Sequence, residues 1–281
     1  MGLRYDRVNA KASLANKDPM GMPLSPNQLY AIYYNGAQAE NTDENNVGGL
    51  LRYEHAINNG NTYVGISRSV RTADATERYL ASNGSTPSMR WVGNPLIDPE
   101  KHHQIEAGIF KDHGLWDIDL SVYANFVDDY ILRDRFHQPV NNATIYRNVD
   151  AELYGFETAV NYQLSDNWDL NFGIGYVYAE NTSDDRAIAQ IPPLEGNIAF
   201  KYNNSDWLTV AKLRFADQQS RVDDDPATGS GLDTGKTPGW AVLDLYASYD
   251  MNETVSVDFG MDNVFDKNYY QHLNRSSAFD P

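Results

Sequence analysis

The stretch GWAVLDLYASYDMNETVSVDFGMDNVFDKNYYQHLNR at residues 239–275 decides how the rest of the chain is interpreted. Apolar and polar side chains alternate over 241–249 and again over 255–261, with the short segment 251–253 between them. A period of two is typical of strands that present one apolar and one polar face. The stretch therefore predicts an antiparallel hairpin. Its apolar positions are Ala241, Leu243, Leu245, Ala247, Tyr249, Val255, Val257, Phe259 and Met261.

Three motifs in the chain resemble those of TonB-dependent outer-membrane receptors. NVFDKNY at 263–269 is similar to a run in the penultimate barrel strand of that family. VGISRSVRT at 64–72 resembles a strand end, and NPLIDPEK at 94–101 resembles the start of a strand. ERY at 77–79, the paired His102 and His103, and the HLNR ending are most similar to the copper-receptor branch.

The resemblance implies a fold, a function and a location in the cell. Receptors of this family close a 22-stranded barrel around an amino-terminal plug, and they lie in the outer membrane of Gram-negative bacteria. They take up ligands with energy from the TonB–ExbB–ExbD system. By this resemblance residues 1–281 form a single partial barrel domain, holding about strands 11 to 21 without the plug or the final strand.

Composition excludes several other classes of protein. The 281 residues carry 22 basic and 39 acidic side chains, a net charge of −17, so the chain lacks the cationic surface that nucleic-acid binding needs. It has no cysteine, which rules out disulfides and thiolate metal sites. Aromatic residues make up 12%, with 19 tyrosines, and this richness favours β structure with rings at membrane interfaces.

Hydropathy is compatible with a membrane barrel. No apolar run approaches the ~20 residues of a spanning helix, and mean hydropathy is −0.57. Barrel strands give only a weak hydropathy signal, because lipid-facing and lumen-facing residues alternate. The first fourteen residues contain no apolar core of a signal peptide, so we expect an internal segment of a longer receptor.

Short turns and long polar loops alternate along the chain, as in outer-membrane barrels with short periplasmic turns and long extracellular loops. Trp116, Trp168 and Trp207 each follow a short turn, and we expect them to form an outward-facing interfacial belt at that end. The short turns are predicted at 58–61, 111–115, 165–167, 203–206 and 250–253. The long loops are predicted at 15–46, 72–101, 133–147, 181–191 and 223–238.

The pattern predicts an all-β fold, an antiparallel up-and-down meander of about eleven long strands. An odd number of strands makes the first and last parallel in direction, so we expect an open segment of a 22-stranded transmembrane β-barrel with two unpaired edges. The strands are predicted at 2–14, 47–57, 62–71, 102–111, 116–132, 147–164, 168–180, 192–203, 207–222, 239–250 and 254–264. Ten charged residues are expected to face the lumen: Asp117, Asp119, Glu157, Asp169, Glu195, Lys201, Lys212, Arg214, Asp244 and Asp258.

Candidate site residues are few. Met20 and Met22 in the first long loop are the candidate metal ligands, because thioethers select cuprous copper. His102 and His103 are adjacent on a strand and should point to opposite faces. Acidic clusters in the loops are candidates for collecting divalent cations, although solvated loop faces are the simpler interpretation. The acidic clusters are Asp43–Glu44, Asp128–Asp129, Asp184–Asp185 and Asp223–Asp225.

An enzyme is not predicted. Asp128, Asp129 and His137 offer the residue types of a hydrolytic set, but nothing in the sequence fixes their mutual geometry, and no catalytic motif is present. We expect wall and extracellular loops of a transporter, with copper as the transported ligand and no bound cofactor. Expected partners are the TonB system, membrane lipid and lipopolysaccharide, and a metal or metal chelate. The alternatives are a receptor for a metal–siderophore complex and a secreted β-rich binding module without a transport role.

Overall fold

The computed structural model describes residues 1–13, 15, 24–137 and 141–274. Eleven long strands form one sheet, and each pairs antiparallel with the next along the chain. The predicted all-β meander is confirmed. The strands are β1 (Gly2–Ala10), β2 (Thr42–Ile57), β3 (Gly60–Arg71), β6 (Glu100–Asp112), β7 (Trp116–Arg135), β8 (Thr144–Ser165), β9 (Trp168–Asn181), β11 (Glu195–Asn203), β12 (Trp207–Ala216), β13 (Trp240–Asn252) and β14 (Val255–Met261).

Short elements lie in the loops between these strands. β4 (Ala81–Ser82) pairs with β5 (Trp91–Val92), β5 contacts β8 through one parallel pair, and β10 (Arg186–Ala187) pairs with β9. Two helices, α1 (Pro26–Tyr33) and α2 (Ala75–Tyr79), and the 3-10 turn η1 (Pro87–Met89) complete the described chain. No helix in the described ranges is long and apolar enough to cross a lipid bilayer.

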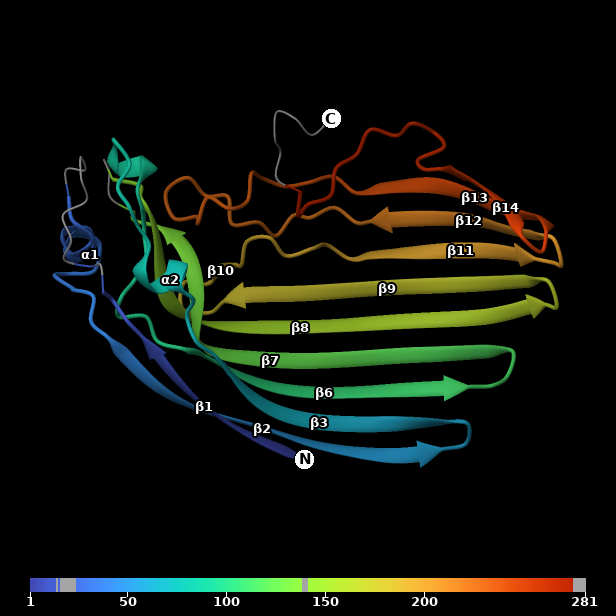
Figure 1. The fold of residues 1–281 in the computed structure, drawn as a ribbon, viewed down its shortest axis with the longest axis horizontal. Coiled ribbons are helices and arrows are strands. Elements are labelled where there is room, and N and C mark those ends of the chain that lie inside the picture. Colours follow the sequence, from blue (N-terminus) through green and yellow to red (C-terminus); the bar gives the residue numbers. More distant parts are fainter. Residues whose placement is uncertain (14, 16–23, 138–140, 275–281) are drawn as a thin grey trace.

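Figure 1 shows the strands stacked in chain order from β1 to β14, with the tight turns at one end and the long loops and helices at the other. Strand lengths explain this asymmetry. β7 and β8 have 20 and 22 residues and continue past their neighbours at the loop end. The alternation of short turns and long loops is therefore confirmed, and it places the helices and the loop contacts on one side of the sheet.

Two loop segments that the sequence analysis treats as polar and irregular form helices. Ser25 caps α1, where its side chain accepts from the backbone of Gln28 and Gln28 bonds back to Ser25. Asp74 and Glu77 make the same reciprocal arrangement at α2. Such capping boxes satisfy the backbone donors that a helix start leaves free, so they fix short helices inside long loops.

Three strands end earlier than predicted, and one of them is β14, which stops at Met261 rather than at 264. β1 stops at Ala10 rather than at residue 14, and β12 stops at Ala216 rather than at 222. Beyond Ala216 the chain leaves the ladder because Asp217 donates to Leu194 O and Gln219 pairs with Thr237 in an isolated bridge. Loop contacts thus replace strand pairing at that end.

The sheet is open. β1 pairs only with β2 and β14 only with β13, so no hydrogen bonds join the first and last strands of the described chain. The prediction of two unpaired edges is confirmed. Unpaired strand edges expose backbone donors and acceptors that a bilayer cannot satisfy.

The clusters of buried hydrophobic residues lie at the loop end of the sheet, because a single-layer sheet has no second layer to cover it. One cluster packs α1 against the loop end of β8, and the others surround the bulged region of β7 and β8. The cluster on α1 comprises Leu29, Tyr30, Tyr33, Val92, Ala143 and Ile145.

Candidate functional site

The ten charged residues predicted for the lumen fall on one face of the sheet, as the strand register shows. Directly paired residues of antiparallel neighbours share a face, and positions two apart on a strand do too. Three of the ten, Asp117, Lys212 and Asp244, lie in one row of directly paired residues, and six others lie two or four positions along a strand from a member of that row. Asp258 pairs with Ser248, four positions from Asp244. The row itself runs through Asp117, Asn161, Asn171, Ala199, Lys212 and Asp244.

Loop segments fold across this polar face, which identifies it as the inner one. Arg78 of α2 forms a buried ion pair with Glu44 of β2. At the other edge, Tyr269 stacks on Trp240 with ring centroids 4.5 Å apart. The inner face therefore carries these contacts to the loops.

The predicted tryptophan belt lies on the opposite, apolar face. Trp116, Trp168 and Trp207 are the first residues of β7, β9 and β12, all at the turn end of the sheet. Trp168 packs against Tyr202 and Trp207 against Tyr249, with centroid distances of 5.0 and 4.5 Å. Aromatic pairs at one end of the apolar face are typical of a membrane interface.

Polar contacts connect inner-face side chains across strands. Asn171 donates to Asn161 at 2.5 Å, and Asn161 donates to Asp117 at 2.9 Å. Arg214 Nε donates to Asp244 at 2.5 Å, and Asp244 is almost fully buried. Charges held in such chains suit a wall that faces water rather than lipid.

Tyrosines lie over glycines on the same inner face. Tyr63 is the direct cross-strand partner of Gly108, and Tyr123 is that of Gly155. A Cβ added to Gly155 would lie 2.6 Å from the Tyr123 ring, so the ring occupies the space that a side chain would fill. Arg52 stacks on Tyr63 at 3.6 Å from the ring centroid. In these pairs the tyrosine ring fills the space beside the glycine on the neighbouring strand.

At the loop end, hydrogen bonds made by tyrosine hydroxyls hold α1 against α2, β5 and β8. Tyr30 donates to Tyr79 O at 2.6 Å, while Tyr34 donates to Val92 O at 2.7 Å and accepts from Tyr146 N at 3.1 Å. Burial raises the pKa of Tyr30 to about 12 and also raises the pKa of Tyr34. Both hydroxyls therefore keep the proton that they donate.

A second fastening joins α2 to the sheet through Arg71. Its guanidinium donates to Glu77 of α2 at 3.0 Å and to Glu100 of β6 at 2.7 Å. The Glu100 side chain is only 4% exposed and also accepts from Ile131 N at 2.7 Å. His102 contacts the same carboxylate at 3.1 Å. The loop that carries α2 is thereby held over the inner face.

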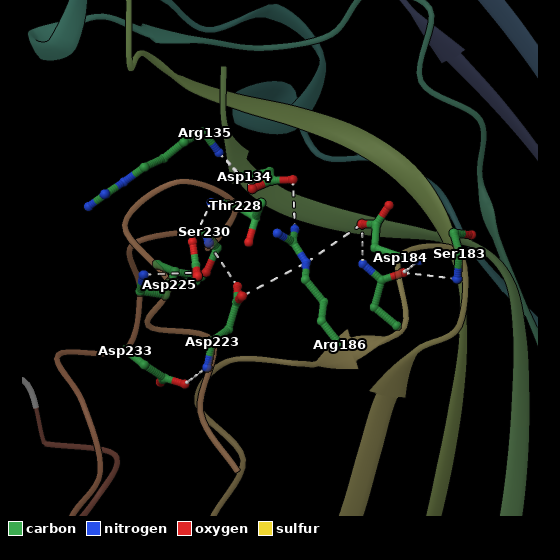
Figure 2. Close-up of polar contacts among 12 residues, drawn as sticks. Asp134, Arg135, Ser183, Asp184, Arg186, Asp223, Asp225, Thr228, Ser230 and Asp233 are labelled. Atoms are coloured by element: carbon green, nitrogen blue, oxygen red, sulfur yellow. Dashed lines mark hydrogen bonds and ion pairs between the residues drawn. The ribbon is translucent and has the colours of Figure 1, made fainter. Parts of the chain in front are cut away.

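A third network joins the loop end of β7 to two loops around Asp134, as Figure 2 shows. The Asp134 side chain is 1% exposed and contacts Arg147 Nε at 2.6 Å and Arg186 Nη2 at 2.8 Å. Arg186 Nε lies 3.6 Å from Asp184 and 3.8 Å from Asp223. Arg186 thus links β7, the turn after β9 and the loop between β12 and β13 in one ion cluster.

Asp184 is a charged member of that network at neutral pH. Burial alone raises its pKa, but hydrogen bonds from Arg147 and Asn181 outweigh the burial and hold the pKa below its usual value. The carboxylate is stabilised because both partners donate to it.

In the loop between β12 and β13, aspartate side chains accept hydrogen bonds from backbone N–H groups of the same loop. Asp225 accepts from Thr228 N at 2.9 Å, Asp223 from Ser230 N at 2.8 Å, and Asp233 from Asp223 N at 2.9 Å (Figure 2). Carboxylates bonded to backbone donors act as turn-forming groups. This favours the simpler interpretation of that acidic cluster over a cation site.

The sequence-predicted metal residues are not brought into a described site. Met20 and Met22 lie outside the described residues. His102 and His103 pair with Ser69 and Arg68 and so point to opposite faces, as predicted. Within the described ranges, no group of three or more His, Asp or Glu side chains is placed to hold a metal ion.

Asp128, Asp129 and His137 are not assembled into a hydrolytic set. Asp128 and Asp129 form a bulge of β7, where the register shifts between Val127 and Tyr130. Each of the three side chains has its own partner. These are His103 for Asp128, Lys101 for Asp129 and Asp134 for His137.

The side-chain contacts that hold the loops in place are not predicted by the sequence. Asp134, Arg147 and Arg186 belong to no motif, whereas Arg71 lies in VGISRSVRT at 64–72 and its partners Glu77 and Glu100 lie in ERY and NPLIDPEK. Arg186 and Asp134 are separated by 52 positions. The one local signal was the capping pattern, in which a Ser or Asp precedes a Gln or Glu by three residues.

Comparison with known proteins gives one family. The family model described as TonB dependent receptor-like, beta-barrel matches residues 1–264. A probable TonB-dependent siderophore receptor, PiuA, of Acinetobacter baumannii is 22% identical over 96% of the chain. A ferric-pyoverdine BN7/BN8 receptor of Pseudomonas putida is 27% identical over 66% of it. The chain spans 35% and 22% of the lengths of these two relatives.

Solved structures give the same architecture. The structure of the copper transporter OprC superimposes with a TM-score of 0.77 and 28% identity, covering 97% of this chain and 40% of that one. A ferric enterobactin receptor of Pseudomonas aeruginosa superimposes with a TM-score of 0.64 and 19% identity, covering 81% of this chain and 36% of that one.

Proposed function

This chain belongs to the TonB-dependent receptor family of β-barrels, and from that premise we propose that it forms wall and extracellular loops of a transporter for copper. Members of the family are receptors and transporters of the Gram-negative outer membrane. The predicted location and the prediction that the chain is not an enzyme agree with this membership. A secreted binding module without a transport role does not.

The observation that supports this proposal is the division of the single-layer sheet into a polar and an apolar face. One face holds rows of charged and amide side chains, and the other holds apolar side chains and a belt of tryptophans. A sheet that separates water from lipid needs this division, because a Lys or Arg facing the middle of a bilayer costs roughly 2–4 kcal/mol. The loops held by these hydrogen bonds and ion pairs lie at the end of the sheet where a ligand would arrive from outside the cell.

The open edges support a place within a larger barrel. β1 and β14 each lack a partner on one side, and the chain spans 40% of the copper transporter that it resembles. We propose that residues 1–281 form one partial barrel domain, about strands 11 to 21 of 22. Further strands would satisfy both edges, and a plug inside the barrel would connect the receptor to the TonB–ExbB–ExbD system.

Copper is the favoured ligand for one specific reason. The structure of the copper transporter superimposes on 97% of the chain with a TM-score of 0.77. That of the ferric enterobactin receptor superimposes on 81% of the chain with a TM-score of 0.64. Two relatives found by sequence are described as a siderophore receptor and a ferric-pyoverdine receptor, so uptake of a ferric siderophore is the second candidate. Met20 and Met22 remain the proposed ligands, because thioethers prefer cuprous copper.

Metal accumulation tests the proposal. The receptor that carries this chain would be expressed in a bacterium lacking its own copper receptors, and cellular copper and iron would be measured by mass spectrometry with and without TonB. We expect TonB-dependent accumulation of copper. Replacing Met20 and Met22 by Leu should lower it, while Met251→Leu at the turn end of β13 should not. Accumulation of iron from a ferric siderophore, without copper, would favour the second candidate.

A further inference from the structure

The apolar face contains a groove where β1, β2, β3, β6 and β7 run side by side. Its volume is about 680 Å³, enough for an acyl chain. Its outward-pointing side chains are apolar except for those of Arg68 and His103. The outward-pointing lining residues are Leu3, Val47, Gly49, Leu51, Ile66, Arg68, His103, Ile105 and Phe126.

The register explains why the surface is hollow there. Five directly paired residues form one transverse row, and Gly49 contributes no side chain to it. The Leu3 side chain leans toward Gly49, with Cδ2 3.2 Å from where a Cβ would stand. The floor of the groove therefore lies between a Leu on one side and an Arg on the other. The row is Leu3, Gly49, Arg68, His103 and Phe126.

Arg68 lacks an anionic partner. Its guanidinium donates to the carbonyl of Val47 and contacts no carboxylate of the described chain. His103 beside it pairs with Asp128 at 3.4 Å, and both of those side chains are largely exposed. A guanidinium has five donors, so Arg68 can bind an anion in addition to its contact with Val47 O.

The position along β3 sets the depth of Arg68 in a membrane. It lies eight residues from Gly60, which starts β3 at the short turn. Eight residues span about 26 Å along a strand. At a tilt near 45° this is about 18 Å of height, within an apolar band about 25 Å tall and toward its loop side. Arg68 can therefore reach the headgroup level of the outer leaflet.

We propose that this groove binds a phosphate-bearing lipid of the outer leaflet, with an acyl chain along Leu51, Ile66 and Ile105 and the phosphate on Arg68 and His103. The inference rests on the proposed function, because it requires the apolar face to meet lipid. Charge complementarity selects an anionic headgroup, and the apolar walls select a lipid rather than a free anion. Such a lipid would neutralise the one unpaired guanidinium of the groove.

Binding would be tested on the detergent-purified receptor and its Arg68→Gln variant. Native mass spectrometry would count retained phosphatidic acid, diacylglycerol with the same acyl chains, and inorganic phosphate. Arg7→Gln is the matched control, because Arg7 lies on the same outward face, pairs with Asp43 and does not line the groove. Arg68→Lys keeps the charge.

Loss of a charge-assisted contact should weaken retention of phosphatidic acid about tenfold in Arg68→Gln. Arg7→Gln and Arg68→Lys should stay near the unmodified protein, and diacylglycerol should be retained poorly. Equal retention by Arg68→Gln, equal loss in Arg7→Gln, or equal binding of inorganic phosphate would each overturn the inference.

A second readout separates this inference from the proposed function. Brominated lipids should quench the fluorescence of Trp116, Trp168 and Trp207 in vesicles. Quenching together with unchanged lipid retention by Arg68→Gln would refute only the lipid site. Absence of quenching would refute the membrane-facing assignment itself.

Discussion

Arg186 of β10 donates to the buried carboxylate of Asp134 on β7 at 2.8 Å, across 52 positions of sequence. Because Arg186 also lies within 4 Å of Asp184 and Asp223, one side chain connects the end of β7 to the turn after β9 and to the loop between β12 and β13. A buried carboxylate that loses a partner pays the cost of its own desolvation. The geometry of the loop end therefore depends strongly on this arginine.

Arg186→Gln should loosen the loop end without unfolding the sheet. Asp134 would keep Arg147 as a partner, so we expect a loss of about 1–3 kcal/mol in the free energy of unfolding. Faster protease cleavage between β12 and β13 should accompany it. Arg221→Gln is the control, since Arg221 is 42% exposed and pairs with Glu180 at the surface. Equal protease resistance of both variants would contradict the role of Arg186.

Acid should weaken the same network through Asp184. Its pKa in the folded protein lies below the ordinary value of 3.8, because hydrogen bonds from Arg147 and Asn181 outweigh burial. A lowered folded pKa contributes stability above the unfolded pKa, and that contribution is lost as the pH falls through the folded pKa. The free energy of unfolding should therefore exceed that of Asp184→Asn above about pH 5, and the difference should shrink below about pH 4. A difference independent of pH would contradict this assignment.

Strand faces could be predicted from the sequence because they follow from local alternation. Trp116, Lys212 and Asp258 were assigned correctly, since a period of two fixes each side chain relative to its neighbours. The open edges followed from an odd strand count. The helices α1 and α2 are not predicted, because the segments that contain them are polar in composition. Ser25 and Gln28 do form the capping pattern of a helix start.

The loop networks could not be predicted for a different physical reason. Arg71, Arg147 and Arg186 find their partners only after the strands have brought distant loops together. Arg71 and Glu100, for instance, are 29 positions apart and become cross-strand neighbours through the β3–β6 register. Nothing in the local sequence distinguishes Arg147 and Arg186 from arginines on the solvated surface.

The tyrosine–glycine pairs of the inner face should behave as coupled units. In Gly155→Ala the new methyl group would stand 2.6 Å from the Tyr123 ring, and we expect a loss of about 1–3 kcal/mol in the free energy of unfolding. Tyr123→Ser in the same chain should restore part of it, with a coupling energy of about 0.5–3 kcal/mol. Gly175→Ala is the control, because its nearest atom is 3.6 Å away. Additive effects of the two substitutions would contradict the pairing.

Adjacent residues of β11 provide a direct test of the two faces. Phe200 pairs with Leu170 and Ala211 on the apolar face, whereas Lys201 pairs with Asp169 on the polar face. The chain has no cysteine, so Phe200→Cys and Lys201→Cys each give a single labelling site.

An environment-sensitive dye attached at residue 200 should be quenched by brominated lipid in vesicles, because its side chain would meet acyl chains. The same dye at residue 201 should be quenched by aqueous iodide instead, because that side chain points into water. A one-residue change of position reverses the face of a strand, so neighbouring sites must respond oppositely if the sheet is a membrane wall. Similar quenching at both sites would mean that the two faces of the sheet share one solvent, and the assignment of the chain to a barrel wall would be wrong.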